Sequence, residues 1–229
     1  MKFIIASDIH CHFDETLDKI KELYKENLDV RYVLIAGDLT NTGTTQEMLD
    51  TMFFFERIGM ETPLRTYYIT GNHDKHSQNT YNHTMIDAYA YAENITDENR
   101  LVTHTTKESD FNSFTIQGFN LSPCFGAPQL ALEYERMTPY RDFDLGYFTL
   151  RSPADIILSH CPPAGLTLSE CNWKGETVDI GSPGLRQYIE ETKPKLVVCG
   201  HVHEGGGMTE YIGDTKIVNT ATKVMIVEL

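Results

Sequence analysis

Five apolar runs in this chain end in residues that commonly bind metals, and this pattern constrains the fold more than any other feature. The runs cover residues 3–6, 32–36, 67–70, 156–159 and 196–199. Short apolar runs bounded by polar residues are typical of buried strands. Residues at helical spacing follow the first two runs, which predicts βαβ units and an α/β fold with a largely parallel sheet. The residues that close the five runs are Asp8 with His10, Gly37-Asp38, Gly71-Asn72-His73-Asp74, His160, and Gly200-His201-Val202-His203.

These polar residues are expected to meet at one edge of the fold, because ligands bind beyond the carboxyl ends of the strands in open α/β sheets. Asp8 and His10 are two residues apart, as are His201 and His203. In an extended chain this spacing puts both side chains on one face. The glycines in three of the motifs allow the backbone to turn sharply. Two carboxylates, one carboxamide and four imidazoles exceed the ligands of one catalytic zinc, so the surplus predicts two metal ions.

Helix signals lie between these runs. Asp14 is expected to cap a helix, and the sequence Thr44-Thr45-Gln46-Glu47 has capping-box form and opens a second helix, which Gly59 closes. Ser182 and Pro183 begin a third helix before Lys193-Pro194. Residues 114–116 and 119–121 suggest antiparallel pairing, and strands near 216–218 and 224–227 predict a closing meander.

Composition places the chain among globular proteins of one domain, expected over residues 1–229. It has 41% hydrophobic residues and 23% charged residues, so a sizeable core is available. The formal net charge of -14 argues against binding of long nucleic acid or of an anionic membrane surface. We therefore expect a small ligand.

The location expected from the sequence is the cytoplasm. No apolar stretch is long enough to span a membrane, and the first apolar residues are too few for a signal-peptide core. The five cysteines are scattered and lack a C-x-x-C pair, which suits a reducing compartment.

The motifs D-x-H, G-D, G-N-H-D, H and G-H-x-H, in this order over the whole chain, resemble the calcineurin-like metallophosphoesterase superfamily. The resemblance implies a two-sheet β sandwich flanked by helices, in four layers α/β/β/α. It also implies two divalent metal ions (Mn, Fe or Zn), with Asp38 as the bridging ligand. The implied ligands of one metal are Asp8, His10, Asp38 and His203, and those of the other are Asp38, Asn72, His160 and His201. It leaves His73 as the general acid, with Asp74 to orient it.

Within this superfamily the chain looks most like the small phosphodiesterase branch that includes class III cyclic-nucleotide phosphodiesterases. Protein phosphatases typically have G-D-x-x-D-R-G, whereas residues 37–43 here are Gly-Asp-Leu-Thr-Asn-Thr-Gly and lack the arginine. The resemblance implies hydrolysis of a small phosphodiester, with a nucleotide-type compound favoured, by a metal-bridging hydroxide. The alternatives are a phosphomonoesterase or protein phosphatase, a nuclease, and a non-catalytic scaffold. The oligomeric state is open.

Further candidates for contact with the substrate lie outside the motifs. The basic residues Lys75, His76, Arg141 and Arg186 are candidate phosphate contacts, and His12 is a candidate neighbour of the metals. Trp173 and Tyr140 are expected on loops that could cover the crevice, within or near the loops at 75–85, 123–149 and 161–181. Phe53-Phe54-Phe55 is expected to be core rather than a stacking surface.

Overall fold

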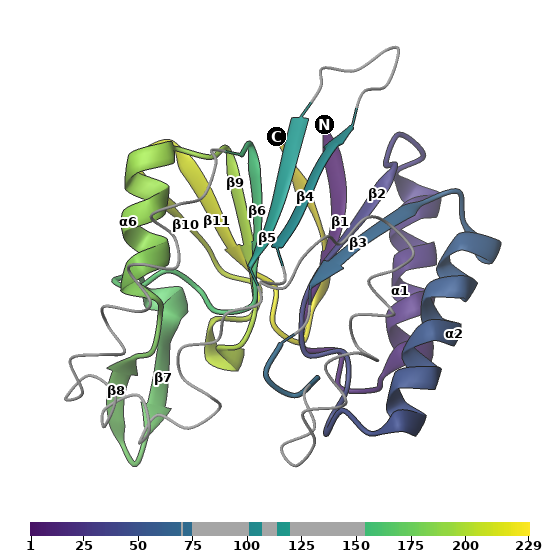
Figure 1. The fold of residues 1–229 in the computed structure, drawn as a ribbon, viewed down its shortest axis with the longest axis horizontal. Coiled ribbons are helices and arrows are strands. Elements are labelled where there is room, and N and C mark those ends of the chain that lie inside the picture. Colours follow the sequence, from purple (N-terminus) through teal and green to yellow (C-terminus); the bar gives the residue numbers. More distant parts are fainter. Residues whose placement is uncertain (70, 75–100, 107–113, 120–153) are drawn as a thin grey trace.

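The computed structural model describes residues 1–69, 71–74 and 154–229, together with the backbone of 101–106 and 114–119. Two sheets face each other with helices on their outer sides, so the layers run α/β/β/α as predicted (Figure 1). The first sheet has the order β12-β1-β2-β3. Its strands are β1 (Lys2–Ala6), β2 (Tyr32–Ala36), β3 (Arg65–Ile69) and β12 (Val224–Glu228).

The second sheet has the order β10-β11-β9-β6-β5-β4. Four of its neighbouring strands, β11, β9, β6 and β5, run parallel, and the two edge strands pair antiparallel. The strands are β4 (Leu101–Thr106), β5 (Phe114–Phe119), β6 (Ile156–Ser159), β9 (Leu196–Cys199), β10 (Thr209–Ile212) and β11 (Thr215–Asn219). Residues 114–116 and 119 therefore belong to one strand, which pairs antiparallel with β4, and residues 120–121 lie outside the described residues.

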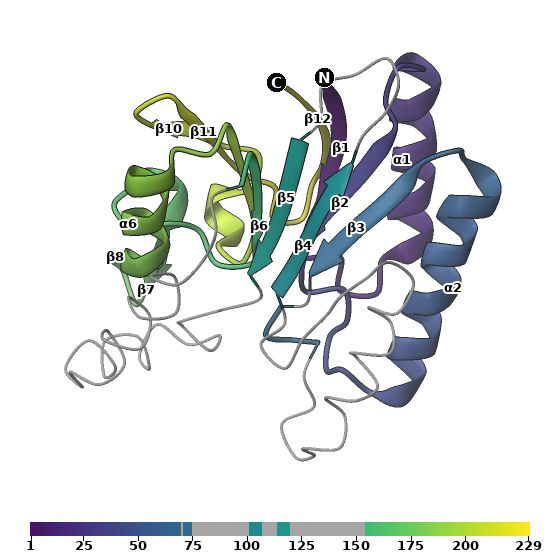
Figure 2. The same cartoon turned by 45° about the horizontal axis from the view of Figure 1, so that its top comes forward.

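Helices α1 (Phe13–Glu26) and α2 (Thr45–Glu61) cover the first sheet, and α6 (Pro183–Thr192) covers the second, as both views show (Figure 2). Because each sheet is covered on both faces, β1, β2, β6 and β9 are buried along nearly their whole length. The core between the sheets contains Phe3, Ile5, Leu34, Tyr67, Leu158, Val198 and Val218. Within the described residues, no helix is long and apolar enough to cross a membrane.

Two predictions about helix ends need correction. His12, not Asp14, occupies the N-cap of α1, and Asp14 lies in its first turn, where it pairs with Arg57. Gly59 lies inside α2, which continues to Glu61, so it does not close that helix. Capping by Thr44 with Glu47 and by Ser182 is confirmed.

The chain end does not form a meander. After β10 and β11 pair as a hairpin, β12 crosses to the first sheet and pairs antiparallel with β1. The residues at 161–181 are also more ordered than a loop. They contain the short helix η3 (Thr167–Ser169) and a hairpin of β7 (Glu170–Trp173) and β8 (Glu176–Asp179), and the short helix η4 (His203–Gly205) follows β9.

Candidate metal centre

The residues predicted from the strand ends do converge. Asp8 follows β1, Asp38 follows β2, and Asn72 and His73 follow β3 in the first sheet. His160 follows β6, and His201 and His203 follow β9 in the second sheet. Within each sheet these strands run parallel to one another, so their carboxyl ends lie at the same edge of that sheet. The site joins both sheets.

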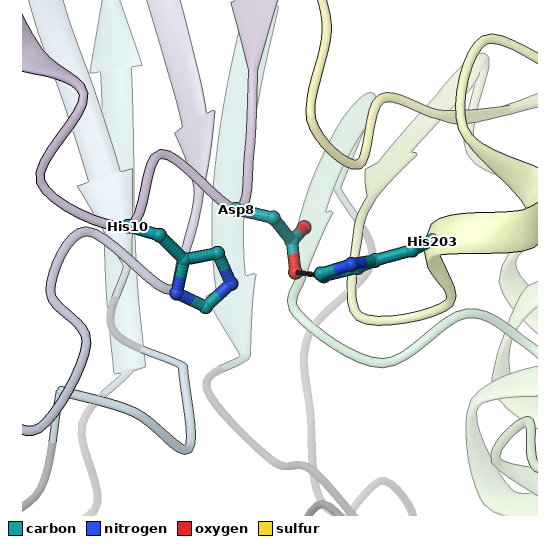
Figure 3. Close-up of side chains that lie close together, drawn as sticks. All are labelled: Asp8, His10 and His203. Atoms are coloured by element: carbon teal, nitrogen blue, oxygen red, sulfur yellow. Dashed lines mark hydrogen bonds and ion pairs between the residues drawn. The ribbon is translucent and has the colours of Figure 1, made fainter.

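A first ligand group consists of Asp8, His10 and His203, each with a ligand atom within 4.8 Å of the others. Figure 3 shows the carboxylate of Asp8 between the two imidazole rings. His203 Nε2 lies 3.1 Å from Asp8 Oδ1. His10 Nδ1 lies 3.2 Å from the carbonyl oxygen of Thr40, which can only accept a hydrogen bond. That contact leaves Nε2 of His10 as the nitrogen available to a metal.

Two hydrogen-bond donors fix the position of the Asp8 carboxylate. The hydroxyl of Ser7 donates to Oδ2 at 2.6 Å, and the backbone N–H of His201 donates to the same oxygen at 3.0 Å. The Asp8 side chain is fully buried, whereas the His203 side chain is 51% exposed. The group therefore has a rigid carboxylate at its base and an imidazole at its open side.

A second ligand group consists of Asp38, His160 and His201, again within 4.8 Å of one another. His160 Nδ1 lies 2.8 Å from the carbonyl oxygen of Ala36, so this nitrogen carries a proton. The other nitrogen, Nε2, lies 2.9 Å from Asn72 Oδ1 and 3.3 Å from Asp38 Oδ2. Two oxygen acceptors thus converge on one ring nitrogen, an arrangement that a proton or a metal cation stabilises.

The two groups are neighbours. The backbone N–H of His201, a member of the second group, donates to Asp8 Oδ2 of the first group at 3.0 Å. The His73 ring lies 4.9 Å from that of His10, while its backbone N–H donates to Asp38 Oδ1 at 2.8 Å. His73 therefore stands beside both groups.

Charges in the site are strongly coupled. Burial would raise the pKa of Asp8, but the hydrogen bond from His203 and the charge of His160 hold it below its ordinary value. Burial also opposes the charged form of Asp38, and His160 is the main cause of its lowered pKa. Burial opposes the charged form of His160, yet Asp38 and Asp8 raise its pKa to about 9. Burial and the charge of His160 lower the pKa of His201 to about 3.

This donor set fits divalent transition metals. Each group offers one carboxylate oxygen and two imidazole nitrogens, a mixture that suits Zn, Fe and Mn. A proton on His160 Nε2 would point toward Asn72 Oδ1 and Asp38 Oδ2, so a proton and a metal ion would compete for this nitrogen. The fit supports a metal-binding role for both groups.

Comparison with known proteins decides the family. Residues 1–205 match the family profile described as calcineurin-like phosphoesterase. The chain belongs to this family. It is 25% identical over 227 residues to a UPF0046 protein of Caenorhabditis elegans, an alignment that covers 96% of this chain and 75% of that protein.

Solved structures of this calcineurin-like phosphoesterase fold are similar to the chain. The protein TT1561 of Thermus thermophilus has a TM-score of 0.56 and 17% identity, with 96% of this chain and 88% of that chain covered. The phosphopantetheinyl hydrolase of Mycobacterium tuberculosis has a TM-score of 0.58 and 15% identity, with 97% and 89% covered. At these identities the likeness shows the shared fold.

The backbone that presents the ligands of this phosphoesterase is left-handed rather than extended. The φ angles are 53° at Asp8, 47° at His10, 52° at Asp38 and 67° at His201. The predicted i, i+2 pairs do share a site, but tight turns bring them together and an extended strand does not. Left-handed φ at a non-glycine residue carries an energetic cost that the surrounding structure must offset.

The glycines of the phosphoesterase motifs serve close approach more than turning. Gly37 has a φ of 94°, as a sharp turn requires. A Cβ at Gly71 would lie 2.2 Å from Asp38 Oδ1, and one at Gly200 would lie 2.2 Å from Asp8 Oδ2. Neither distance is sterically possible, so these two glycines leave room for the ligand carboxylates.

Asp74 and His73 have different surroundings from those expected. The Asp74 carboxylate is buried and accepts hydrogen bonds from the backbone N–H of Gly71 at 2.8 Å and of Thr40 at 2.8 Å. The His73 Nδ1 lies 2.7 Å from the carbonyl oxygen of Asn41. The carbonyl of Asn41, rather than the carboxylate of Asp74, thus orients the His73 ring, and Asp74 ties together the loops after β2 and β3.

A cavity of about 610 Å³ opens over the phosphoesterase centre. Its lining from the ligand loops is Asp38, Asn72, His73, His201, Val202, His203 and Glu204. The opposite lining comes from the β7–β8 region and includes Cys171, Asn172, Trp173 and Ile180. The sequence reasoning missed this hairpin, although the two-residue turn Lys174-Gly175 between alternating residues is a signal that would have found it.

Other candidate contacts have mixed outcomes. His12 lines a separate hollow beside Asp8 and His10 and pairs with Glu15 at 3.1 Å. Arg186 pairs with Glu190 on α6, which occupies its guanidinium. Phe54 is buried in the core as expected, whereas Phe53 is 62% exposed. The candidates Lys75, His76, Tyr140 and Arg141, and the loops 75–85 and 123–149, lie outside the described residues.

Proposed function

We propose that this phosphoesterase hydrolyses small phosphodiesters with two divalent cations. The observation that carries the proposal is the placement of two three-ligand groups side by side at one cavity, with His73 next to both. The proposed ligands are Asp8, His10, Asp38 and His203 for one cation, and Asp38, Asn72, His160 and His201 for the other. The bridging role of Asp38 is part of this proposal.

Two divalent cations, when bound, offset the negative charge of a phosphate and lower the pKa of water toward neutrality. The choice among Mn, Fe and Zn depends on metal supply as well as on ligand type. The ligand residues themselves supply a fixed frame, since Asp8 and His160 are buried and hydrogen-bonded to neighbouring groups. A frame of this kind would hold the cations in place without rearranging during the reaction.

His73 is the proposed general acid. Its Nδ1 faces the carbonyl oxygen of Asn41, so Nε2 is the nitrogen that would hold the proton for the leaving oxygen. The side chain is exposed within the described residues and borders the cavity, where a substrate oxygen can reach it. The rings of His160 and His203 each lie against a ligand carboxylate, whereas Nδ1 of His73 lies against the carbonyl oxygen of Asn41.

A diester is favoured over a monoester because the arginine of the G-D-x-x-D-R-G motif is absent from residues 37–43. A monoester dianion carries one more negative charge and gains more from such an arginine. The net charge of -14 disfavours long polyanions, and a cavity of about 610 Å³ suits a compact ligand. The phosphopantetheinyl hydrolase shares the fold and is by its title a hydrolase, which agrees with this proposal. We keep the expectation that the protein works in the cytoplasm.

The test compares the kcat/KM of the Mn²⁺-loaded protein for bis-p-nitrophenyl phosphate and for p-nitrophenyl phosphate, with plasmid DNA as a third substrate. We expect the diester to be preferred and plasmid to remain uncut. The control is Glu56→Gln, which changes an exposed side chain of α2, a helix that supplies no residue to either ligand group. A preference for the monoester would indicate a phosphomonoesterase, plasmid cleavage would indicate a nuclease, and no turnover with both metals bound would indicate a scaffold.

A further inference from the structure

The β7–β8 hairpin forms a second side of the cavity over the metal centre. It contributes Cys171, Asn172 and Trp173, whereas the ligand loops contribute His73, His201 and the other residues described above. A phosphate held at the ligand groups would therefore have room for one of its substituents in the space that the hairpin borders. The hairpin has no part in the metal chemistry, so any role it has concerns that substituent.

The local sequence fixes where Trp173 stands. Lys174 and Gly175 have φ angles of 51° and 89°, as a two-residue type I′ turn requires. The Asn172 side chain accepts a hydrogen bond from the backbone N–H of Gly175 at 3.0 Å, which stabilises the turn. Trp173 is consequently the last residue of β7 and pairs with Glu176 across the hairpin.

The hairpin is fastened to the loop that carries two of the ligand histidines. Cys171 packs against Ile180 and Val202, and Val202 lies between His201 and His203. The Glu204 carboxylate accepts a hydrogen bond from the backbone N–H of Asn172 at 3.2 Å. Because Cys171 and Trp173 are two residues apart on a strand, the Trp173 side chain lies on the same face as the packed Cys171. Its position relative to the metal centre is therefore set by the fold.

We propose that Trp173 is a specificity-determining residue that stacks against a planar heterocycle carried by one ester group of the substrate. The inference rests on the proposed function and names the substrate class, a diester with a nucleobase-like ring. Trp173 is half-buried, so its indole has both a fixed position and an open surface. Aromatic stacking of this kind accepts any planar ring.

Size and charge agree with this class of ligand. A cavity of about 610 Å³ lies within the range of small-molecule sites and accommodates a nucleotide-sized compound. The Glu204 carboxylate at the same cavity favours ring N–H donors over a second anionic group. Lys174 Nζ lies 5.5 Å from the centre of the indole ring, and Lys174 is not among the described residues that line the cavity. That cation–π contact orders the ring from outside the cavity.

The first experiment measures binding without turnover. Trp173 is the only tryptophan in the sequence, so the indole fluorescence of the protein reports on this one position. The Zn²⁺-loaded protein is titrated with adenosine 5′-monophosphate and, as the matched ligand without a ring, with ribose 5-phosphate. We expect saturable quenching by the nucleotide and little change with the sugar phosphate. Equal responses to both ligands, or no response to either, would overturn the inference.

The second experiment uses two diesters with the same leaving group, thymidine 5′-(p-nitrophenyl phosphate) and methyl p-nitrophenyl phosphate. In Trp173→Ala we expect kcat/KM for the nucleotide ester to fall roughly 5- to 100-fold, the loss that corresponds to one stacked base. The methyl ester should change by less than about twofold, and Trp173→Phe should retain most of the activity on both. Phe53→Ala, which removes an exposed aromatic ring on α2, is the control and should leave both rates unchanged.

The two experiments separate failure of the inference from failure of the proposed function. An equal loss on both diesters in Trp173→Ala would show that the ring supports the hairpin and not the substrate, which overturns the inference. If the wild type hydrolyses both diesters but the nucleotide does not quench the indole fluorescence selectively, the inference is also overturned. Selective quenching without any hydrolysis would instead keep the ring-binding site and reject the proposed function.

Discussion

The two ligand groups of the metal centre differ in how closely the protein encloses them. In the Asp38, His160 and His201 group, the His160 side chain is fully buried and the Asp38 side chain is 3% exposed. In the Asp8, His10 and His203 group, Asp8 is buried but the His203 side chain is 51% exposed. The enclosed group is fixed by hydrogen bonds to the backbone of Ala36 and His73, whereas the open group has one ligand that solvent reaches. We therefore expect a cation bound at the enclosed group to exchange more slowly than one bound at the open group.

The two groups also differ in the pKa values of their side chains. In the buried group, Asp38 and His160 lie 3.3 Å apart, and their attraction outweighs the effect of burial, so the pKa of Asp38 is lowered and that of His160 is raised to about 9. In the open group, burial lowers the pKa of His10, while the hydrogen bond to Asp8 raises that of His203. A metal ion would replace this shared charge in both groups.

The largest loss of activity is expected from substitution of Asp38, the residue proposed to bind both cations. Asp38→Asn removes the one carboxylate proposed to serve both cations, and it also leaves His160 without its charged neighbour. We expect loss of at least one metal and a fall in kcat of about 10⁴-fold or more. Metal analysis by plasma mass spectrometry and steady-state kinetics measure the two losses. Two retained metals with a near-normal rate would contradict the bridging role.

His73→Ala tests the residue that stands beside both groups without belonging to either. We expect both metals to stay bound and kcat to fall about 10²- to 10⁴-fold on a diester with a poor alkoxide leaving group. The loss should shrink on nitrophenyl esters, because a nitrophenolate leaves without a proton. Equal losses on both kinds of ester would count against a general acid. Asn41 contributes only its backbone carbonyl to the His73 contact, so Asn41→Ala is the matched control and should retain activity.

Removal of metal should expose the buried charge pair as a pH dependence of stability. The folded-state pKa of His160 is about 9, above the ordinary 6.5, so its protonation stabilises the metal-free fold below about pH 6.5. That contribution is lost as pH rises through 9, and His203, whose pKa is also raised, changes in the same direction. We expect the free energy of unfolding to fall by up to about 3 kcal/mol between these pH values.

Urea unfolding of the chelator-treated protein at pH 6.5 and pH 9 measures this change. The metal-loaded protein is the control, because there the cation takes the place of the proton and the slope with pH should be smaller. His160→Gln should flatten the dependence of the metal-free protein. A flat profile in the metal-free wild type would show that the pair does not titrate in this range.

Metal exchange compares the two groups directly. A chelator should remove the metals in two phases, a fast one from the open group and a slow one from the enclosed group. His203→Ala removes the half-exposed ligand, so we expect the affinity for the faster metal to weaken about 10- to 100-fold while the slower phase is kept. Stopped-flow mixing with a coloured chelator gives both rates. Loss of both phases in this variant would mean that the groups do not bind metal independently.

The sequence predicted which residues would lie together at this site because they follow strands whose bounds are set by local pattern. The strands at 32–36, 156–159 and 196–199 end where the apolar runs end. The turns beyond them could not be predicted, since the left-handed φ angles at Asp8 and His201 depend on loops that meet only in the folded protein. The same holds for Asp74, whose partners Gly71 and Thr40 come from two different loops.

Other predictions failed because the neighbouring sequence does not contain the information that decides them. The antiparallel partner of β12 is β1, more than two hundred residues earlier, and no pattern near the chain end indicates that pairing. The run Phe53-Phe54-Phe55 predicts core packing from hydrophobicity alone, yet Phe54 is buried while Phe53 is 62% exposed. That residues 1–229 form a single domain stays a prediction.

The smallest expected effect lies away from both groups, at Gly59. Its helical position in α2 costs stability relative to alanine, because glycine loses more backbone entropy on folding. A Cβ built at Gly59 meets nothing within 4 Å, so an added methyl group causes no clash. Gly59→Ala should therefore raise the free energy of unfolding by about 0.5–1 kcal/mol. Urea unfolding measures this gain, and the two chelation phases should keep their rates, since the helix gains stability without a change at either ligand group. Slower chelation in this variant would show that metal release depends on opening of the whole fold, and the difference between the open and enclosed groups would then not be local.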